Sequence, residues 1–132
     1  MQDEAKKKGL PWSIAKGFDT FLPISNIIPK DRITDPHNLL LWLKVNEQTR
    51  QSDNTDLMLF NIPRMLSDIS KVMGLEEGDI VLTGTPKGVG PIKGGDIVTC
   101  GLEVAGKAVV EGNIEVEVQD DTSEDGYVFA ET

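Results

Sequence analysis

The chain has 132 residues, which suits one domain, and its 22 Asp and Glu against 13 Lys and Arg give a formal net charge of −9. A nucleic-acid partner requires clustered Lys and Arg to neutralise phosphates, so this acidity excludes that class of partner. No segment approaches the roughly 18 apolar residues of a membrane-spanning helix, so we expect no membrane partner.

The single cysteine, Cys100, excludes an internal disulfide framework and is typical of a reducing compartment. Its neighbours, DIVTCGLEV, alternate as in a strand, so we expect a small buried thiol rather than a nucleophile. The start, MQDEAKKKG, lacks the apolar core of a secretory signal and is too acidic for a transit peptide. We expect an intracellular protein, mitochondrial or cytoplasmic, and any targeting sequence would precede Met1.

The N-terminal part of the chain predicts one short helix followed by irregular structure. Residues 2–8 are charged and favour a helix, with Gly9 just past its end. Residues 10–29 mix apolar residues with Pro, Gly and Asn, which predicts extended segments and turns. The DPHN sequence at 35–38 predicts a turn, and we expect its His37 to be a surface residue rather than a ligand.

Residues 39–51 predict a β-hairpin with Asn46 and Glu47 in its turn, where hairpins prefer Asn-Gly. The period of two places four apolar residues on one face: Leu39, Leu41, Leu43 and Val45. The QSDNTD sequence that follows predicts a polar loop.

Residues 61–75 predict the one long helix. Asn61 caps its start, Pro63 is tolerated in its first turn, and Gly74 ends it. Six apolar residues recur at helical spacing, and we expect this stripe to pack in the core. They are Ile62, Met65, Leu66, Ile69, Val72 and Met73.

Three β runs follow the helix, DIVLTG, GDIVTCGLEVAG and KAVVEGNIEVEV, with glycine-containing turns between them. This order predicts an α+β fold that is mostly β. We expect residues 1–118 to form one domain and residues 119–132 to be a solvated, mobile acidic tail.

The glycine-rich segment GDIVLTGTPKGVG, residues 78–90, is the candidate binding loop. It fails the Walker A pattern because Val89 stands where that pattern has its second glycine. It fails the dinucleotide fingerprint because Lys93 stands at the position of the third glycine. No helix is predicted to follow the segment, so the helix N-terminus that would hold a phosphate is missing.

Two interpretations of this segment remain open. Thr83 and Thr85 stand two apart, so both hydroxyls are expected on the same side of a strand end, beside Gly84, where a ligand can approach the backbone. The alternative is a plain β-turn whose glycines adopt positive φ.

Three segments together resemble the C-terminal half of the fumarylacetoacetate hydrolase superfamily: GLPWSIAKGFDTFLP, DPHNLLLWLKVN and LEEGDIVLTGTPKGVGP. The resemblance covers residues 2–118 and points to the branch of acylpyruvate hydrolases and oxaloacetate decarboxylases. It implies a β-roll of mixed sheets with few helices, usually dimeric. It also implies cleavage of a C–C bond beside a 2-oxo acid that is bound to Mg2+ (or Mn2+). Acylpyruvate hydrolysis and oxaloacetate decarboxylation release the same pyruvate enolate, so one enolate-stabilising site serves both reactions.

The resemblance also assigns residues of this chain to the site. Lys16 matches the active-site lysine, which holds the substrate carboxylate or the developing enolate oxygen. Gln2 matches a glutamine that lines the same pocket. Thr85, with the backbone near Gly84, matches the threonine that binds the substrate carboxylate.

The family's metal ligands, an E-x-E pair and an Asp, match no residue of this chain, and neither does its acid–base pair on a lid. All of them precede Gln2 in the family order. We therefore expect the C-terminal part of such an enzyme, without metal ligands of its own and homodimeric when full length. The alternatives are a catalytically inactive fragment, a β-rich module that binds small carboxylates without chemistry, and a related fumarylpyruvate hydrolase or hydroxymuconate-type isomerase.

Overall fold

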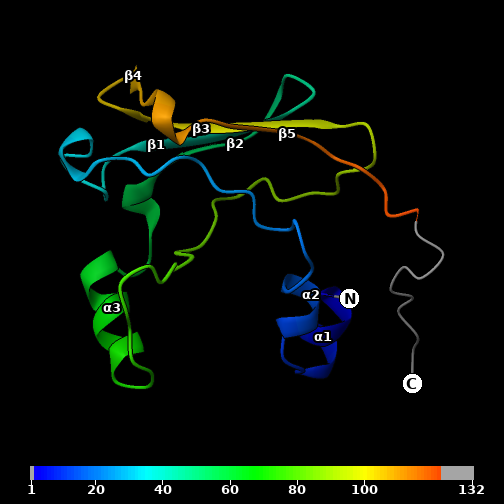
Figure 1. The fold of residues 1–132 in the computed structure, drawn as a ribbon, viewed down its shortest axis with the longest axis horizontal. Coiled ribbons are helices and arrows are strands. Elements are labelled where there is room, and N and C mark those ends of the chain that lie inside the picture. Colours follow the sequence, from blue (N-terminus) through cyan, green and yellow to red (C-terminus); the bar gives the residue numbers. More distant parts are fainter. Residues whose placement is uncertain (1, 123–132) are drawn as a thin grey trace.

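A computed structural model describes residues 2–122 of the chain, and one antiparallel sheet forms its centre (Figure 1). The sheet contains β1 (Leu40–Val45), β2 (Gln48–Asn54), β3 (Ile97–Val104), β4 (Lys107–Ala108) and β5 (Ile114–Glu117). The strand order is β2-β1-β3-β4, and β5 pairs with β3 beside β4. The prediction of a mostly β, α+β fold is confirmed.

The predicted hairpin is present as β1 and β2, joined by Asn46 and Glu47 at φ of 48° and 65°. Both residues are left-handed, as a two-residue hairpin turn of the I′ type requires. Strand β2 continues to Asn54, so the prediction of a polar loop from Gln51 onward is wrong for its first part. Polar side chains on a half-exposed strand do not prevent its backbone from pairing. The register shifts between Leu43 and Lys44, and this bulge leaves Arg50 without a ladder partner.

The pairing of β1 with β3 is long-range, because Val45, at one end of the ladder, pairs with Val98, 53 positions further along the chain. Trp42 pairs with Gly101 in this ladder. A Cβ on Gly101 would lie 2.7 Å from the Trp42 ring, so only glycine leaves room for the indole.

A polar cluster of Asn46, Lys93, Asp96 and Ile97 ties the hairpin turn to the start of β3. The Asn46 amide donates to Asp96 Oδ1 at 2.8 Å, and Asn46 Oδ1 accepts from the Ile97 N–H at 2.9 Å. The Lys93 N–H donates to Asp96 Oδ2 at 3.0 Å. Asp96 is buried, and these bonds satisfy its carboxylate away from water.

The helical elements are short. They are α1 (Gln2–Lys8), α2 (Ser13–Lys16), α3 (Ile62–Ser70), and the 3₁₀ turns Lys30–Arg32, Thr55–Leu57 and Val110–Gly112. Gly9 follows α1 at a φ of 66°, as predicted. In Figure 1 the sheet runs along the top and the three α-helices lie below it. Within residues 2–122, no helix has the length and apolar character needed to cross a bilayer.

Helix α3 begins as predicted, because the Asn61 side chain accepts from the Arg64 N–H at 2.9 Å. His37 Nε2 accepts from the Ile62 N–H at 2.9 Å, so the surface histidine also holds this helix terminus. The prediction that the apolar stripe of α3 packs in the core is wrong. None of its residues is buried, and Val72, just past its end, is 81% exposed. No described element packs closely against that stripe.

The prediction of a strand over DIVLTG is also wrong. Residues 79–84 belong to no ladder. Alternating apolar residues favour an extended backbone, yet a strand forms only where a neighbouring strand supplies hydrogen bonds.

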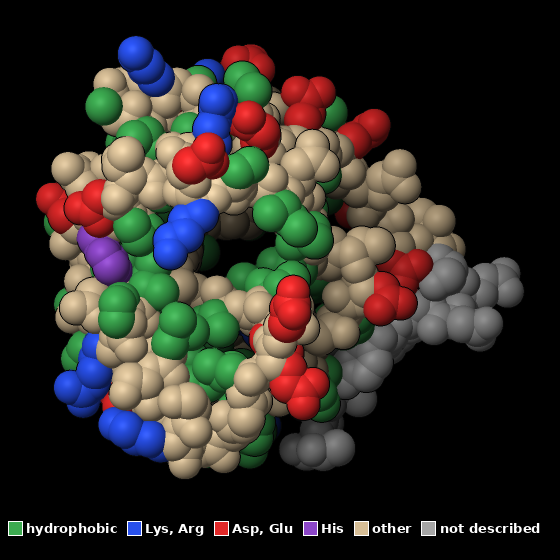
Figure 2. Space-filling model, turned by 60° about the vertical axis from the view of Figure 1, so that its left-hand side comes forward, with side chains coloured by type: hydrophobic (Ala, Val, Ile, Leu, Met, Phe, Trp, Pro, Cys, Tyr) green, Lys and Arg blue, Asp and Glu red, His purple; other side chains and the backbone are tan. Residues whose placement is uncertain are grey.

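The hydrophobic core of the described residues is small. It consists of Leu39, Val45 and Val109, and no described side chain is fully buried. Figure 2 shows hydrophobic side chains around a hollow in one face of the molecule. Cys100 lies half-buried in β3, and burial raises the pKa of its thiol, which fits a structural cysteine.

The division at residue 118 stays a prediction. Residues 119–122 of the acidic tail are described, and the Gly94 N–H donates to Asp120 Oδ1 at 3.2 Å. The predicted mobility of the tail concerns residues 123–132, which lie outside the described part of the chain.

Asp96 gives the fold a testable pH dependence. Hydrogen bonds from the Lys93 backbone, and then from the Asn46 amide, lower the pKa of its carboxyl. A carboxyl whose pKa is lower in the folded state stabilises the fold at every pH above its unfolded-state pKa, which is about 3.9 for Asp. This stabilisation is lost as the pH falls through the folded-state pKa. We expect the thermal midpoint of the wild-type chain to fall when the pH is lowered below about 4. We expect Asp96→Asn to have a lower thermal midpoint at pH 7 and a weaker dependence of that midpoint on pH.

Asp68→Asn is the matched control for Asp96. Arg64 and then Lys71 lower the pKa of the Asp68 carboxyl on an exposed helix surface, where such pairs contribute little. We expect this variant to keep the wild-type midpoint at pH 7. Equal midpoints for Asp96→Asn and the wild-type chain would contradict the role of Asp96.

Candidate functional site

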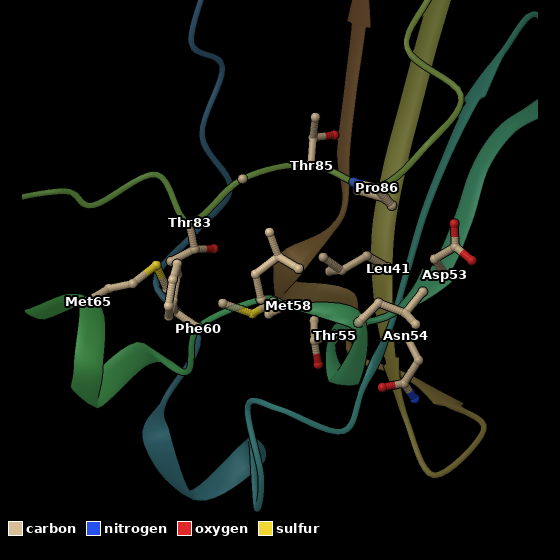
Figure 3. A pocket seen from close by; sticks show the side chains of 13 residues that line it. Leu41, Asp53, Asn54, Thr55, Met58, Phe60, Met65, Thr83, Thr85 and Pro86 are labelled. Carbon is tan, nitrogen blue, oxygen red and sulfur yellow. The ribbon is translucent and has the colours of Figure 1, made fainter.

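A cavity of about 350 Å3 lies between the hairpin, the segment that leads into α3, and the glycine-rich loop (Figure 3). Its wall is mainly apolar on the side of the hairpin and α3, and carries two threonines and a glycine on the loop side. The residues used below are Leu41, Asp53, Met58, Phe60, Met65, Thr83, Gly84 and Thr85. The structure therefore places the predicted Gly84 and Thr85 together on one wall of a cavity.

Strand β2 holds the loop through side chains rather than through a ladder. Gln51 Nε2 donates to Thr85 Oγ1 at 2.9 Å and to the Pro86 carbonyl oxygen at 2.7 Å. Lys87 Nζ lies 3.8 Å from Asp53 Oδ1, and the Asp53 side chain is only 15% exposed. These contacts fix the loop on both sides of Pro86.

The loop also approaches β2 closely at Gly88. This residue has a φ of 102°, and a Cβ on it would overlap the Arg50 carbonyl. Arg50 is the residue that the β-bulge releases from the ladder. Gly88 is therefore required by both its backbone conformation and the space available.

Gly84, at a φ of 111°, changes the direction of the loop between the two threonines. Figure 3 shows the Thr83 side chain on the side of Met58 and Phe60, and the Thr85 side chain on the opposite side of the loop backbone. The expectation that both hydroxyls share one side is wrong. Two residues alternate faces predictably only in a regular strand, and a left-handed glycine breaks that period.

The backbone of this loop is available to a ligand. Among the described residues, no acceptor contacts the backbone N–H of Gly84 or of Thr85. Successive unpaired N–H groups beside a hydroxyl donor form a concave site that suits an anion. Gly84 and Gly88 adopt the positive φ that the plain β-turn alternative expects, but no backbone hydrogen bond closes a turn in residues 82–90, so both interpretations stay open.

Gln2 and Lys16 lie on α1 and α2, outside the wall of this cavity. Both are exposed, and Lys16 Nζ lies 5.9 Å from the centroid of the Trp12 ring. That contact is a cation–π interaction at an exposed site. The structure brings Gly84 and Thr85 together but leaves Gln2 and Lys16 on a separate pair of helices.

The described residues do not fit a metal centre. No group of three or more His, Cys, Asp or Glu side chains within residues 2–122 is placed to hold an ion.

Sequence reasoning missed Gln51 and Asp53, and it missed the apolar wall formed by Met58 and Phe60. A signal for the first two was present, because Gln51 and Asp53 alternate with Ser52 as neighbours on one face of a strand. Assigning that sequence to a loop concealed it.

The fold and the loop together define a mostly β protein with a glycine-rich loop on one wall of a cavity. Residues 1–115 match the fumarylacetoacetate hydrolase C-terminal family, and the chain belongs to that family. The predicted resemblance is confirmed.

Three curated relatives carry names that indicate a shared substrate. The chain is 58% identical over 102 residues to the mitochondrial oxaloacetate tautomerase FAHD1 of Bos taurus, which covers 77% of this chain and 46% of that protein. It is 58% identical to the mitochondrial oxaloacetate tautomerase oaa1 of Schizosaccharomyces pombe, over 80% of this chain and 48% of the relative. It is 52% identical to the mitochondrial oxaloacetate decarboxylase of Dictyostelium discoideum, over 76% and 46% respectively. The chain thus spans about half the length of the curated relatives it matches.

Solved structures share the fold. A yeast fumarylacetoacetate hydrolase family protein, ynq8, has a TM-score of 0.88 and 43% identity, over 98% of this chain and 54% of that chain. The 2-hydroxyhepta-2,4-diene-1,7-dioate isomerase of Mycobacterium marinum has a TM-score of 0.79 and 38% identity, over 92% of this chain and 45% of that chain. A maleylpyruvate hydrolase from Sphingobium, solved with manganese(II) and pyruvate, has a TM-score of 0.63 and 38% identity, over 70% of this chain and 33% of that chain.

The contact between Gly88 and Arg50 predicts how the loop responds to substitution. We expect Gly88→Ala to lower the free energy of unfolding by about 1–3 kcal/mol, because the added methyl meets the Arg50 carbonyl at an unfavourable φ. Chemical denaturation measures this loss. Faster hydrogen exchange of the Gln51 side-chain amide would report detachment of the loop.

Gly90→Ala is the matched control in the same loop. Gly90 has open space around its Cβ position and a φ outside the left-handed region. We expect its stability to stay within about 0.5 kcal/mol of the wild-type chain. Equal stability of the two alanine variants would show that the loop does not depend on Gly88.

Proposed function

We propose that this chain forms the carboxylate-binding wall of an enzyme that acts on oxaloacetate or a related 2-oxo acid through a pyruvate enolate. The observation that carries the proposal is the loop at Gly84 and Thr85. It combines unpaired backbone N–H groups with a hydroxyl that Gln51 holds in place. The names of the curated relatives, and the pyruvate in the maleylpyruvate hydrolase structure, support a small 2-oxo acid as the ligand.

The proposed roles follow from the chemistry of each side chain. Thr85 and the backbone at Gly84 bind the substrate carboxylate by hydrogen bonds. The family resemblance assigns Gln2 to the same pocket, although in this structure it lies on α1, outside that wall. Lys16 supplies a positive charge on a flexible stem, which suits a carboxylate or a developing enolate oxygen. An exposed position at the end of α2 leaves the Lys16 ammonium free to reach a ligand.

Related enolates account for several reactions: the pyruvate enolate for the two C–C bond cleavages, and the enolate of oxaloacetate itself for tautomerisation. In decarboxylation, the C–C bond to the departing carboxylate breaks and CO2 leaves. The electron pair of that bond moves onto the 2-oxo oxygen. In acylpyruvate hydrolysis, water attacks the acyl carbon and the same enolate departs. In tautomerisation, a proton moves between carbon and that oxygen. A cation beside the oxygen lowers the barrier of each, because the negative charge develops there.

A Mg2+ or Mn2+ requirement stays a prediction, as do a homodimer and a mitochondrial location. The manganese(II) in the Sphingobium enzyme structure supports the first, and the names of the curated relatives support the last. The ion finds no ligand cluster among residues 2–122, so the roles proposed for Lys16 and Thr85 concern the organic substrate alone.

The isomerase of Mycobacterium marinum favours one second candidate, a related reaction on hydroxymuconate-type dienes. Both classes of substrate carry a 2-oxo or 2-hydroxy acid end that the loop would bind. A panel of oxaloacetate, acetylpyruvate, fumarylpyruvate and a hydroxymuconate separates them by the highest kcat/KM. An inactive carboxylate-binding module would bind oxalate and turn over none of the four.

Lys16→Ala tests the assignment of the catalytic lysine. With the protein expressed from its own gene, we expect kcat/KM for oxaloacetate to fall at least about hundredfold, because the positive charge that stabilises the enolate is removed. Pyruvate release and enol absorbance measure the two outcomes of the reaction. The thermal midpoint should not change, since Lys16 is exposed.

Lys6→Ala, on the neighbouring helix, removes the same charge from another exposed position. We expect it to retain wild-type activity. If Lys16→Ala turns over oxaloacetate as fast as Lys6→Ala, then Lys16 does not carry the reaction.

A further inference from the structure

We propose that Gln51 is a positioning residue, which turns the Thr85 hydroxyl into a hydrogen-bond donor aimed at the substrate carboxylate. This inference rests on the proposed function of the loop. Gln51 itself does not line the cavity, so it acts through Thr85 rather than by touching the ligand.

The orientation of the Gln51 carboxamide is fixed by its two partners. Its Nε2 donates to Thr85 Oγ1 at 2.9 Å and to the Pro86 carbonyl oxygen at 2.7 Å. A carbonyl oxygen only accepts, so the opposite orientation would bring the Gln51 oxygen against the Pro86 oxygen. The amide nitrogen is therefore the atom that faces the loop.

This orientation sets the polarity of the Thr85 hydroxyl. Because Oγ1 already accepts a hydrogen bond from Gln51, its own hydrogen points elsewhere, and no acceptor for it is found among the described residues. A hydroxyl that accepts one hydrogen bond also donates a stronger one. A carboxylate accepts hydrogen bonds only, so it matches the free O–H of Thr85.

The surrounding contacts give this arrangement its precision. Gln51 is half-buried on β2, next to the bulge residue Arg50, whose carbonyl touches Gly88. The ion pair of Asp53 and Lys87 holds the loop on the other side. Gln51 thus acts between two further contacts that set its distance from the loop.

Two substitutions of Gln51 test the inference. Gln51→Met keeps the length of the side chain and removes the donor, and Gln51→Glu replaces the donor by an acceptor that takes the Thr85 hydrogen for itself. With the protein expressed from its own gene, we expect each to weaken oxalate binding and raise KM for oxaloacetate about tenfold, while kcat changes less. Calorimetry with oxalate and steady-state kinetics measure these effects.

Gln48→Glu is the matched control, because it adds the same charge to an exposed position on the same strand. We expect its oxalate affinity to stay within twofold of the wild-type protein. An affinity of Gln51→Glu equal to that of Gln48→Glu would overturn the inference.

A double-mutant cycle with Thr85→Val separates positioning from repulsion and from a merely structural role. If Gln51 acts through the Thr85 hydroxyl, Gln51→Glu in the Thr85→Val background should change oxalate affinity less than twofold. A tenfold loss that persists in that background would instead show direct repulsion of the anion, and would overturn the inference. A purely structural role would lower the thermal midpoint without coupling the two residues in oxalate affinity.

The proposed function and this inference fail in different ways. Coupling in oxalate affinity without turnover of oxaloacetate would refute the reaction and leave the role of Gln51 intact. Turnover of oxaloacetate without coupling between Gln51 and Thr85 would refute the role of Gln51 and leave the proposed reaction intact. If the wild-type protein binds no oxalate, the contact can still be tested by NMR. The chemical shift of the Gln51 side-chain amide should change in Thr85→Val, and an unchanged chemical shift would overturn the inference.

Discussion

The attachment of an unpaired segment to the edge of a hairpin is the constraint on which the candidate site depends. Residues 80–90 have no strand partner, so main-chain hydrogen bonds do not determine their position. Three contacts from β2 replace a ladder: the Gln51 amide, the Asp53 carboxylate, and the close approach of Arg50 to Gly88. Each acts on a different part of the loop. Together they leave the N–H groups of the loop free for a ligand, whereas a strand partner would have occupied them.

The hairpin can serve as this support because long-range contacts hold it in turn. Its turn residue Asn46 bonds to the buried Asp96 and to the backbone of β3. The bulge in β2 is a further requirement, since it releases the Arg50 carbonyl toward the loop. The geometry around Thr85 therefore depends on a chain of contacts that runs from Asp96 through the hairpin turn to the bulge.

The structure brings together only some of the residues that the sequence assigns to the site. Gly84 and Thr85, the residues proposed to bind a carboxylate, line the same cavity as Met58 and Phe60, although the Thr85 side chain lies on the other side of the loop backbone. Lys16 lies on a helix outside that wall, and the described residues supply no metal ligand cluster. Likewise, the apolar stripe of α3 has the spacing of a core helix but remains partly exposed. Membership of the fumarylacetoacetate hydrolase C-terminal family explains why these motifs occur together.

Local chemistry alone determined much of this protein. The Asn61 cap, the Gly9 helix end, the Asn46–Glu47 turn and the mostly β character all follow from short-range preferences, and the motifs around Lys16 and Thr85 identified the family. Tertiary structure decided the rest. Whether DIVLTG pairs as a strand and whether the α3 stripe is buried depend on partners distant in sequence. The direction of Thr85 relative to Thr83 depends on the conformation that Gly84 adopts and on the bond from Gln51. Periodicity records what a segment can bury or pair, but the neighbour that completes the hydrogen bond or the packing is specified elsewhere in the chain.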